Sequence, residues 1–377
     1  MPHTASPNRL RRIAGTDPPR PQPWSTLTPQ QILARYRPGK ADPLQVLDVL
    51  LRLFNMQHTA LGKTVSHKTR HERARFLRRF FRDLVDKAGF RRPPDPRNLG
   101  QKHVQAMVQV WQRERLAPAT IQTYLSFLRG LASWLDKPGL VRPPAHYGLR
   151  LEEYERHEYA QRDKSWRAQG LDVEQVLQQV AAFDPRIAAC MRLMHVFGLR
   201  DKESVMLRPH AHVVPFAQTG LPDVGLNADD YLWVKGKGGR VRWIAIDADA
   251  QRLALAQART LVTGQDASMG DPARTLRQNL RRLMYVLEKF GITRRAAGTT
   301  GHGLRHGHVN DLYEQIGGVP SPVRGGPVLP PVQDRAARKA VAERAGHARL
   351  RASGAYIGSV TLARNRPSDR SAEPPCG

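Results

Sequence analysis

Six basic or phenolic residues stand in short, distinctive contexts along the second half of this chain. The contexts are a Gly-Leu-Arg box, a glycine-rich turn, a His-x-x-Arg-His box, and a Gly-His pair whose histidine is followed nine residues later by a tyrosine. The six residues are, in chain order, Arg200, Lys237, His302, Arg305, His347 and Tyr356. Residues so far apart in sequence form one site only if the fold brings their segments together.

Residues 43–138 have a helical pattern throughout. Ser66 can cap a helix that runs to about residue 88, with large apolar residues on one face and arginines on the others. A second helix is expected at 101–114, and Pro118 opens a third that carries an apolar stripe. We therefore predict a helical domain over 43–138. It follows a Pro- and Arg-rich segment, 1–42, which we expect to be flexible and basic.

The second half of the chain combines helices with one β-hairpin. Residues 139–170 are predicted to be a charged linker, followed by a domain at 171–360 and a disordered tail at 361–377. A hairpin is expected at 231–246, where side chains alternate in character on both sides of a glycine-rich turn. Helices are expected at 172–183, 186–197, 248–262, 272–290, 303–316, 333–345 and 348–357, with a Gly- and Pro-rich loop at 317–332. The predicted fold class is mainly α with a small β-hairpin or sheet (α+β).

The charge of the chain points to a polyanionic partner. Lys and Arg number 60 against 33 Asp and Glu, which gives a formal net charge of +27. Basic surfaces gain affinity for nucleic acid by displacing counterions from phosphates. Charge of this size therefore predicts nucleic-acid binding, but it does not separate an enzyme from a passive binder.

Cysteine usage and hydropathy exclude several other classes of protein. The only cysteines, Cys190 and Cys376, favour neither a disulfide framework nor a zinc site built from cysteines, and they fit a reducing, cytosolic setting. The first 40 residues contain no apolar core of a secretory signal. No apolar run reaches the roughly 18 residues that a membrane span needs. We therefore expect no membrane association.

The six residues have the chemistry needed to break a phosphodiester. Attack on phosphorus builds negative charge on the non-bridging oxygens, and Arg200 and Arg305 can meet that charge in place of metal ions. Tyr356 is the candidate nucleophile; a phenol has a pKa of about 10 and needs cations or a base to ionise. His302 and His347 can donate to a phosphate oxygen or accept the phenol proton.

Lys237 is the candidate proton donor to the oxygen that leaves. Its glycine-flanked turn would let it reach a groove, although Lys235, Arg240 and Arg242 lie nearby and could compete or simply contact phosphates. Glu203, one helical turn after Arg200, can orient that guanidinium or cap the following turn. Taken singly, each residue also has an ordinary structural explanation; Arg200, for example, suits a helix end.

The order and contexts of the six residues resemble the active-site signature of the tyrosine recombinase, or phage integrase, family. The matching motifs are Gly-Leu-Arg-x-x-Glu at 198–203, Gly-Lys-Gly at 236–238, His-x-Leu-Arg-His at 302–306, and Gly346-His347 with Tyr356. The resemblance covers roughly 171–360, and the helical segment 43–138 is similar in character to the core-binding domain of that family. One departure is the interval from Arg305 to His347, which is 42 residues and longer than is usual in the family. The surplus lies mainly at 317–331.

The resemblance implies a site-specific recombinase or integrase. Arg200, Lys237, His302, Arg305 and His347 would surround the scissile phosphate, and Tyr356 would attack it to form a 3′-phosphotyrosine link and a free 5′ hydroxyl. The expected partners are double-stranded DNA, further copies of the chain in a homotetramer on two DNA sites, and accessory proteins that bend DNA. No metal or nucleotide cofactor is implied. The expected setting is the cytoplasm, with the chain encoded by a bacterium, a phage or another mobile genetic element.

Two other functions stay open at this point. The chain could be a catalytically inactive, basic DNA-binding accessory protein of the same fold. It could also resemble a type IB topoisomerase, which uses similar chemistry on a single duplex. A covalent protein–DNA adduct requires an enzyme, and strand exchange between two sites requires a recombinase.

Overall fold

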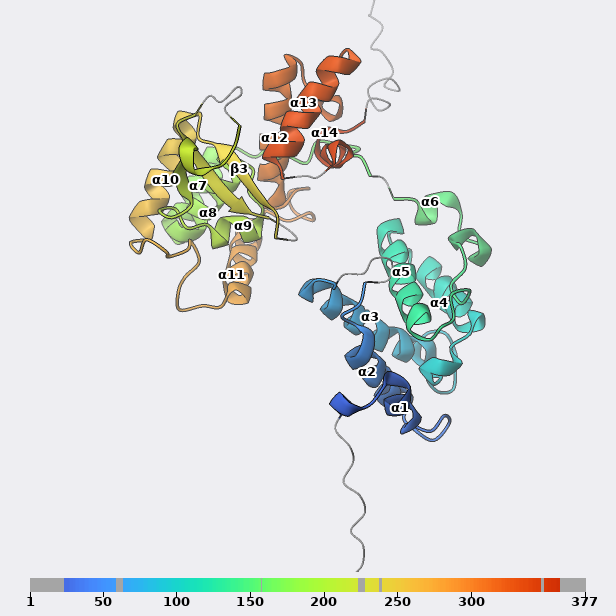
Figure 1. Cartoon of the computed structure of the whole chain (residues 1–377). Coiled ribbons are helices and arrows are strands. Elements are labelled where there is room, and N and C mark those ends of the chain that lie inside the picture. The colour runs from blue at the N-terminus through green and yellow to red at the C-terminus, as the bar shows by residue number, and fades with distance from the viewer. Residues whose placement is uncertain are drawn as a thin grey trace, which may run out of the picture. The chain divides into compact units, whose positions relative to one another are not determined.

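The structure is a computed structural model that describes residues 24–58, 64–156, 158–222, 228–236, 239–346 and 349–359. Contacts divide the chain into a first unit that ends at Arg156 and a second that begins at His157. Helices dominate both units, and the second also contains a three-stranded antiparallel sheet (Figure 1). The predicted fold class, mainly α with a small sheet, is confirmed.

The elements described in the first unit are all helices, apart from an isolated β-bridge between Gln57 and Thr64. Its elements are η1 Trp24–Thr26, α1 Pro29–Ala34, α2 Pro43–Phe54, α3 His67–Asp86, η2 Pro96–Asn98, α4 Gln101–Arg113, α5 Pro118–Trp134, η3 Pro144–Tyr147 and α6 Leu151–Tyr154. Ser66 caps α3 by accepting from Thr69 N. Part of the segment expected to be flexible forms α1, because Thr28 and Gln31 make a reciprocal capping box. Residues 1–23 lie outside the described residues.

The segment 139–170 is shared between the two units. Leu140, Tyr147 and Leu149 are buried in the core of the first unit, together with the apolar faces of α2 to α5. Trp166, by contrast, is buried in the main core of the second unit. The division of the chain at Arg156 therefore falls within the segment that the sequence predicts to be a linker.

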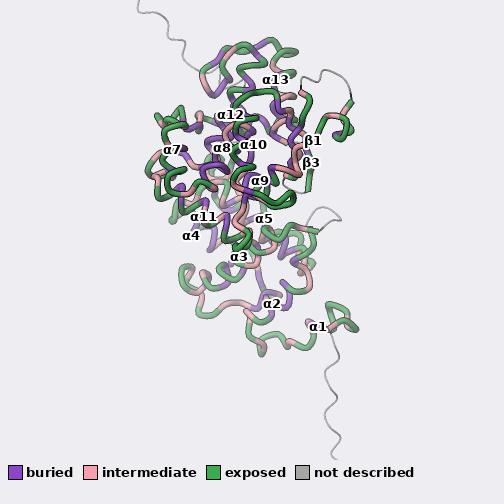
Figure 2. The backbone as a smooth tube through the Cα atoms, turned by 90° about the vertical axis from the view of Figure 1, so that its left-hand side faces the viewer, coloured by how far each residue is buried: buried purple, intermediate pink, exposed green. Residues whose placement is uncertain are grey.

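The second unit is built around α8. Its elements are η4 Arg167–Gln169, α7 Val173–Phe183, α8 Pro185–Phe197, α9 Asp201–Met206, β1 Val213–Pro215, η5 Phe216–Gln218, β2 Asp230–Lys235, β3 Val241–Ala245, α10 Asp249–Leu261, α11 Leu276–Lys289, α12 His302–Gly317, η7 Pro322–Arg324, α13 Pro331–Arg344, η8 Leu350–Ser353 and α14 Gly354–Ile357. Helix α8 packs against α7, α10 and α12. Both α8 and α12 are largely buried (Figure 2). A helix with buried residues on most of its faces lies inside a domain.

The predicted hairpin is present and belongs to a larger sheet. Strand β2 pairs with β3, with Trp233 opposite Trp243, and β1 adds a third, outer strand. The sequence analysis missed β1, which has only three residues. Leu232 and Ile244 face the main core. Arg242 lies two residues before Ile244, so its side chain is on the same buried face of β3.

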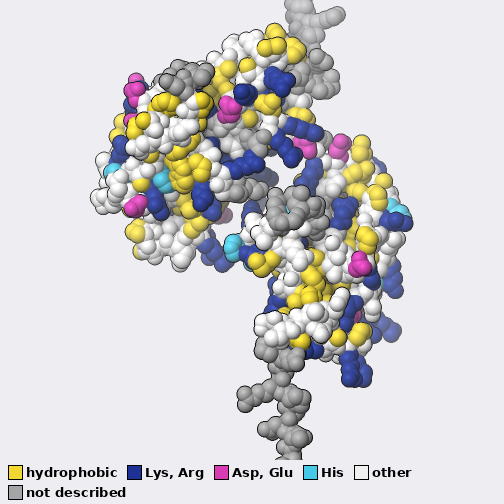
Figure 3. All heavy atoms as spheres, in the orientation of Figure 1, with side chains coloured by type: hydrophobic (Ala, Val, Ile, Leu, Met, Phe, Trp, Pro, Cys, Tyr) yellow, Lys and Arg dark blue, Asp and Glu magenta, His cyan; other side chains and the backbone are white. Residues whose placement is uncertain are grey.

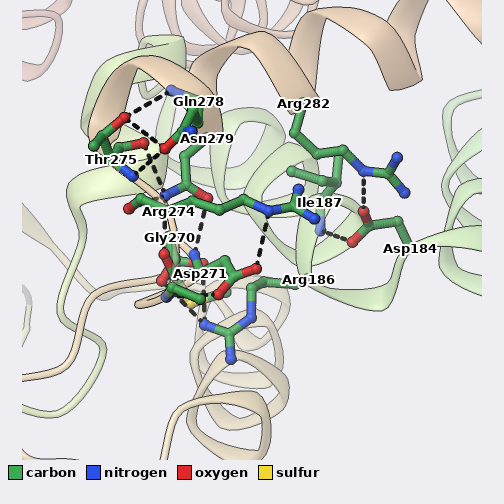
Figure 4. A network of polar contacts seen from close by, with 12 residues as sticks. Asp184, Arg186, Ile187, Gly270, Asp271, Arg274, Thr275, Gln278, Asn279 and Arg282 are labelled. Atoms are coloured by element: carbon green, nitrogen blue, oxygen red, sulfur yellow. Dashed lines mark hydrogen bonds and ion pairs between the residues drawn. The ribbon is translucent and has the colours of Figure 1, made fainter.

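Polar contacts join α11 to the start of α8 (Figure 4). Arg282 Nε donates to an Asp184 carboxylate oxygen at 2.8 Å, and the other carboxylate oxygen of Asp184 accepts from Ile187 N, capping α8. The Asn279 amide accepts from Asp271 N at 2.9 Å and donates back to the Asp271 carbonyl at 3.1 Å. Helix α11 begins at Leu276, later than the predicted residue 272, because Thr275 caps it.

The last helices form a second, smaller core. Helices α12, α13 and α14 lie together (Figure 1), with Val309, Tyr313, Val341, Tyr356 and Ile357 among the buried residues of their shared cluster. The single helix predicted at 348–357 is wrong in detail, since the described part forms η8 followed by the short α14. None of the described helices is long and apolar enough to cross a membrane.

Candidate active site

Arg200, Glu203 and Arg242 form a buried ionic network at the start of α9. Arg200 precedes the first residue of the helix, and both its backbone N and its guanidinium donate to Glu203, at 3.0 and 2.7 Å. Arg242 of β3 donates to the same carboxylate through both Nη atoms, at 3.2 and 2.8 Å. Glu203 therefore both caps α9 and fixes two guanidinium groups.

The charge of this network is stable across the physiological range. Burial by itself would raise the pKa of Glu203, but the hydrogen bonds and charge of Arg242, together with Arg200, hold that pKa at about 2. Side chains of Glu203 and Arg242 are only 4% and 7% exposed, whereas that of Arg200 is 27% exposed. Arg200 is therefore the member of the network that can meet a ligand from outside.

Arg305 and Tyr356 are in direct contact. Arg305 Nε donates to the Tyr356 hydroxyl oxygen at 3.0 Å. Its two Nη atoms donate to the carbonyls of Gly198 and Ala345, the latter at 2.6 Å. Arg305 is fully buried and approaches Glu203 to 4.0 Å, so the tyrosine hydroxyl and the Arg200 network share one polar interior.

Two histidines of α12 face the tyrosine. The ring of His302 lies 5.6 Å from the Tyr356 ring and that of His306 lies 4.7 Å from it, measured between centroids. Burial, together with the charges of Arg305 and Arg200, lowers the pKa of His302 to about 4. Burial also lowers the pKa of His306 to about 3. Both rings are thus neutral at pH 7 and can accept a proton.

Lys237 and His347 lie outside the described residues, but the glycine before each of them is described. A Cβ atom placed on Gly236 would lie 3.3 Å from both the Arg242 Nη1 and the Glu203 Oε1 atoms. A Cβ atom on Gly346 would lie 2.8 Å from Arg242 Cδ, and Gly346 has a φ of 67° that favours glycine. Both glycines therefore lie close to Arg242, and Gly236 also lies close to Glu203.

Three residues near the site were not singled out as site residues from the sequence. Arg242 was considered only as a surface cation of the hairpin, yet its place on the Ile244 face of β3 indicates burial. His306, four residues after His302, shares a helix face with it. Lys164 contributes to lowering the pKa of both histidines, and its carbonyl accepts from Thr299 Oγ1 at 2.6 Å. No local motif marks Lys164.

The surface of both units is basic. Figure 3 shows Lys and Arg side chains spread over the visible face, with fewer acidic side chains among them. Helix α3 contributes to this surface through Arg75, Arg78 and Arg82, which alternate along its sequence with the buried residues Phe76 and Leu77. The charge excess of the sequence is therefore carried by folded helices in addition to the terminal segments.

Known proteins support the interpretation of both units. Residues 52–138 match the family model described as "Phage integrase, N-terminal". The fold resembles a lambda integrase tetramer bound to a Holliday junction, with a TM-score of 0.53 and 15% identity over 90% of this chain and 83% of that one. It also resembles a lambda integrase dimer bound to a COC′ core site, with a TM-score of 0.51 and 16% identity over 91% of this chain and 87% of that one.

The chain therefore carries a segment that matches a phage integrase N-terminal domain, and its fold is that of lambda integrase. No curated protein matches its sequence. Both similarities agree with the resemblance inferred from the ordered motifs of the second half. The fold brings Arg200, His302, Arg305 and Tyr356 together from α9, α12 and α14. Their roles stay predictions.

Proposed function

We propose that this chain is a site-specific DNA recombinase that cleaves and rejoins DNA through a 3′-phosphotyrosine intermediate. The observation that carries the proposal is the contact between the Tyr356 hydroxyl and Arg305 Nε, next to the Arg200–Glu203 network and two neutral histidines. A phenol beside guanidinium groups is suited to attack phosphorus, because the cations stabilise both the phenolate and the pentacoordinate phosphate.

Arg200 and Arg305 hold the scissile phosphate in this proposal. Arg200 is partly exposed and keeps donors that Glu203 does not use, so it can meet the phosphate first. Arg305 has no exposed surface while Tyr356 lies on its Nε. Contact between Arg305 and a phosphate therefore requires that a neighbouring group shift when DNA binds.

The proposed cleavage step transfers two protons. Tyr356 Oη forms a bond to phosphorus, the bond from phosphorus to the 5′ oxygen breaks, and the phenol proton passes to a histidine. His302 is suited to accept it because its ring is neutral at pH 7. Lys237 donates a proton to the 5′ oxygen as it leaves. The phosphotyrosine ester preserves the energy of the broken bond, so a 5′ hydroxyl can reverse the step without ATP.

Strand exchange requires more than one copy of the chain. The lambda integrase structures contain a tetramer on a Holliday junction and a dimer on a core site. We infer a homotetramer that exchanges strands between two duplexes, with DNA-bending accessory proteins as further partners, acting in the cytoplasm on DNA of the host or of a mobile element. A type IB topoisomerase would act on one duplex and would not exchange strands.

The test is covalent capture of DNA. Nicked duplexes that tile the DNA flanking the gene should trap an adduct, with excess EDTA present and no ATP. Tyr356→Phe should bind the same DNA and form no adduct, while Tyr313→Phe, a control on α12, should form it normally. An adduct in Tyr356→Phe, or a requirement for magnesium, would contradict the proposal. Exchange between two labelled duplexes separates a recombinase from a topoisomerase.

A further inference from the structure

Tyr356 lies on a helix that is too short to be stable by itself. Helix α14 has four residues, Gly354–Ile357, and so makes little more than one turn. Helices this short are unstable by themselves, because nucleation costs more than one turn of hydrogen bonds returns. Contacts with the rest of the unit must therefore fix the tyrosine.

Helix α12 contacts both ends of Tyr356. Arg305 Nε donates to the phenolic oxygen at 3.0 Å, and Asn310 Nδ2 donates to the backbone carbonyl of the same residue at 3.3 Å. Arg305 and Asn310 are five residues apart on one helix and both are fully buried. Both the side chain and the backbone of Tyr356 are therefore held by residues of one helix, α12.

The Asn310 amide is itself held by the loop at 317–332. Its Oδ1 accepts from the Ser321 hydroxyl, and its Nδ2 also donates to the His306 carbonyl at 2.8 Å. Ser321 is fully buried. An amide with both its oxygen and its nitrogen engaged has one orientation, so Ser321 keeps the Asn310 donor aimed at Tyr356.

The loop is anchored on its other side by ion pairs. Arg324 contacts Asp163 at 3.0 Å and Asp311 at 2.6 Å, which ties the loop to α12 and to the segment that enters the second unit. That entering segment also contacts α14, since Ala160 N donates to the Gly354 carbonyl at 2.8 Å. A Cβ atom on Gly354 would lie 2.3 Å from the Tyr159 ring, so only glycine permits this approach.

We propose that Asn310 and Ser321 are positioning residues that lock the backbone of Tyr356 onto α12, and that the long loop at 317–332 exists to complete this lock within one chain. The inference rests on the proposed function, in which Tyr356 is the nucleophile. A nucleophile displaced by a fraction of an ångström to 1 Å loses rate without losing substrate binding. Asn310 and Ser321 therefore act on the chemical step.

The kinetic test separates rate from affinity. Asn310→Ala should lower the single-turnover rate of adduct formation at saturating DNA by roughly 100-fold, the scale of a small misplacement. Ser321→Ala should lower it by about tenfold, and both variants should keep the wild-type DNA concentration for half-saturation. The double variant should be no slower than Asn310→Ala alone, because the two residues form one chain of bonds.

Tyr313→Phe is the matched control. It removes the 2.6 Å hydrogen bond from Tyr313, on α12 like Asn310, to Asp334 on α13, and this bond involves none of Asn310, Ser321 and Tyr356. This variant should cleave at the wild-type rate. Equal losses in Tyr313→Phe and Ser321→Ala would show general destabilisation and overturn the inference, as would wild-type rates in both Asn310→Ala and Ser321→Ala. Ser321→Ala decides the question where Asn310→Ala does not fold.

Hydrogen exchange gives a readout that does not depend on cleavage. The amide of Gly358 donates to the Gly354 carbonyl at 3.1 Å and reports opening of α14. Exchange there should accelerate in Asn310→Ala and Ser321→Ala and stay unchanged in Tyr313→Phe. If exchange changes as expected while Tyr356→Phe still forms an adduct, the lock is real and the assignment of the nucleophile is wrong. Unchanged exchange overturns the lock itself.

Discussion

The two sides of the candidate site are built into different parts of the second unit. On the arginine side, Leu199 and Val205 flank the Arg200–Glu203 pair and are buried in the main core, where α9 packs against α8 and α11. On the tyrosine side, Tyr356 belongs to the smaller cluster of α12, α13 and α14. Arg305, on α12, contacts residues of both sides, and Arg242 of β3 contacts both Glu203 and the Arg344 carbonyl of α13.

The arginine side therefore supplies fixed charge, and the tyrosine side carries the group that has to move. Charges that stabilise a transition state act best when they are fixed in advance, and a carboxylate with four donors provides that rigidity. A nucleophile must instead approach phosphorus and later release it. A short helix fixed by a few hydrogen bonds can make such a movement at lower cost than an element of the main core.

The largest effect is expected for Lys237 and tests whether proton donation is separate from charge stabilisation. An alkoxide leaves poorly without a proton, so Lys237→Ala should slow cleavage of ordinary DNA by about 10²- to 10⁴-fold. A bridging 5′ phosphorothiolate releases a thiolate, which needs no proton, and should restore most of the rate. Arg200→Ala should show no such recovery. Recovery in Lys235→Ala in place of Lys237→Ala would move the role to the other lysine, and Lys164 becomes the candidate if neither recovers.

Glu203 provides the second test, which concerns the rigidity of the arginine side. Glu203→Ala leaves Arg242 buried without its carboxylate, so the free energy of unfolding should fall by about 3–5 kcal/mol in urea titrations. Glu174 is a suitable control because it also pairs bidentately, with Arg192, but is 55% exposed. Glu174→Ala should cost under about 1 kcal/mol. Similar losses in the two variants would show that burial of the network contributes little.

The third test uses pH to examine the histidine beside the tyrosine. The pKa of His306 is about 3 in the folded chain and about 6.5 in unfolded chains. Because the pKa of His306 is lower in the folded chain, the folded state favours the neutral ring. The contribution of that ring to folding stability is fully present above pH 6.5 and is lost as pH falls toward 3. At pH 5 the loss should be about 2 kcal/mol. His306→Gln should remove that part of the acid destabilisation, and equal pH dependence in the two proteins would contradict the assignment.

Local patterns in the sequence predicted the helices and the hairpin well. Ser66 and Pro118 each mark a helix start that the structure contains, and alternation located β2 and β3. The ordered motifs also led to residues that the fold brings together, such as Arg305 and Tyr356. These features depend on signals carried within a few residues of each other, namely caps, periodicity and short motifs.

The supports of the site could not be predicted in this way. Asn310 and Ser321 have no motif, and their contact depends on how the loop returns to α12. Arg242 could have been identified as buried from its alternation with Ile244, but its partner Glu203 lies 39 residues away. Tertiary contacts also explain why the segment before Tyr356 forms η8 and a short α14 where local pattern predicts one helix.

The smallest effect is expected where the two sides meet at the surface. Arg344 of α13 pairs with Asp247, just after β3, at 2.9 Å, and their side chains are 32% and 28% exposed. The Arg344 carbonyl also accepts from Arg242 Nε at 3.0 Å, a bond that Arg344→Ala retains. Since the variant loses only a partly exposed ion pair, unfolding free energy should fall by no more than about 1 kcal/mol. Adduct formation should stay within about fivefold of the wild-type rate, because about 1 kcal/mol corresponds to no more than that even if it is fully expressed in the activation barrier. A loss as large as that in Glu203→Ala would mean that α13 and the sheet behave as one rigid body, and the two sides of the site could then not move independently.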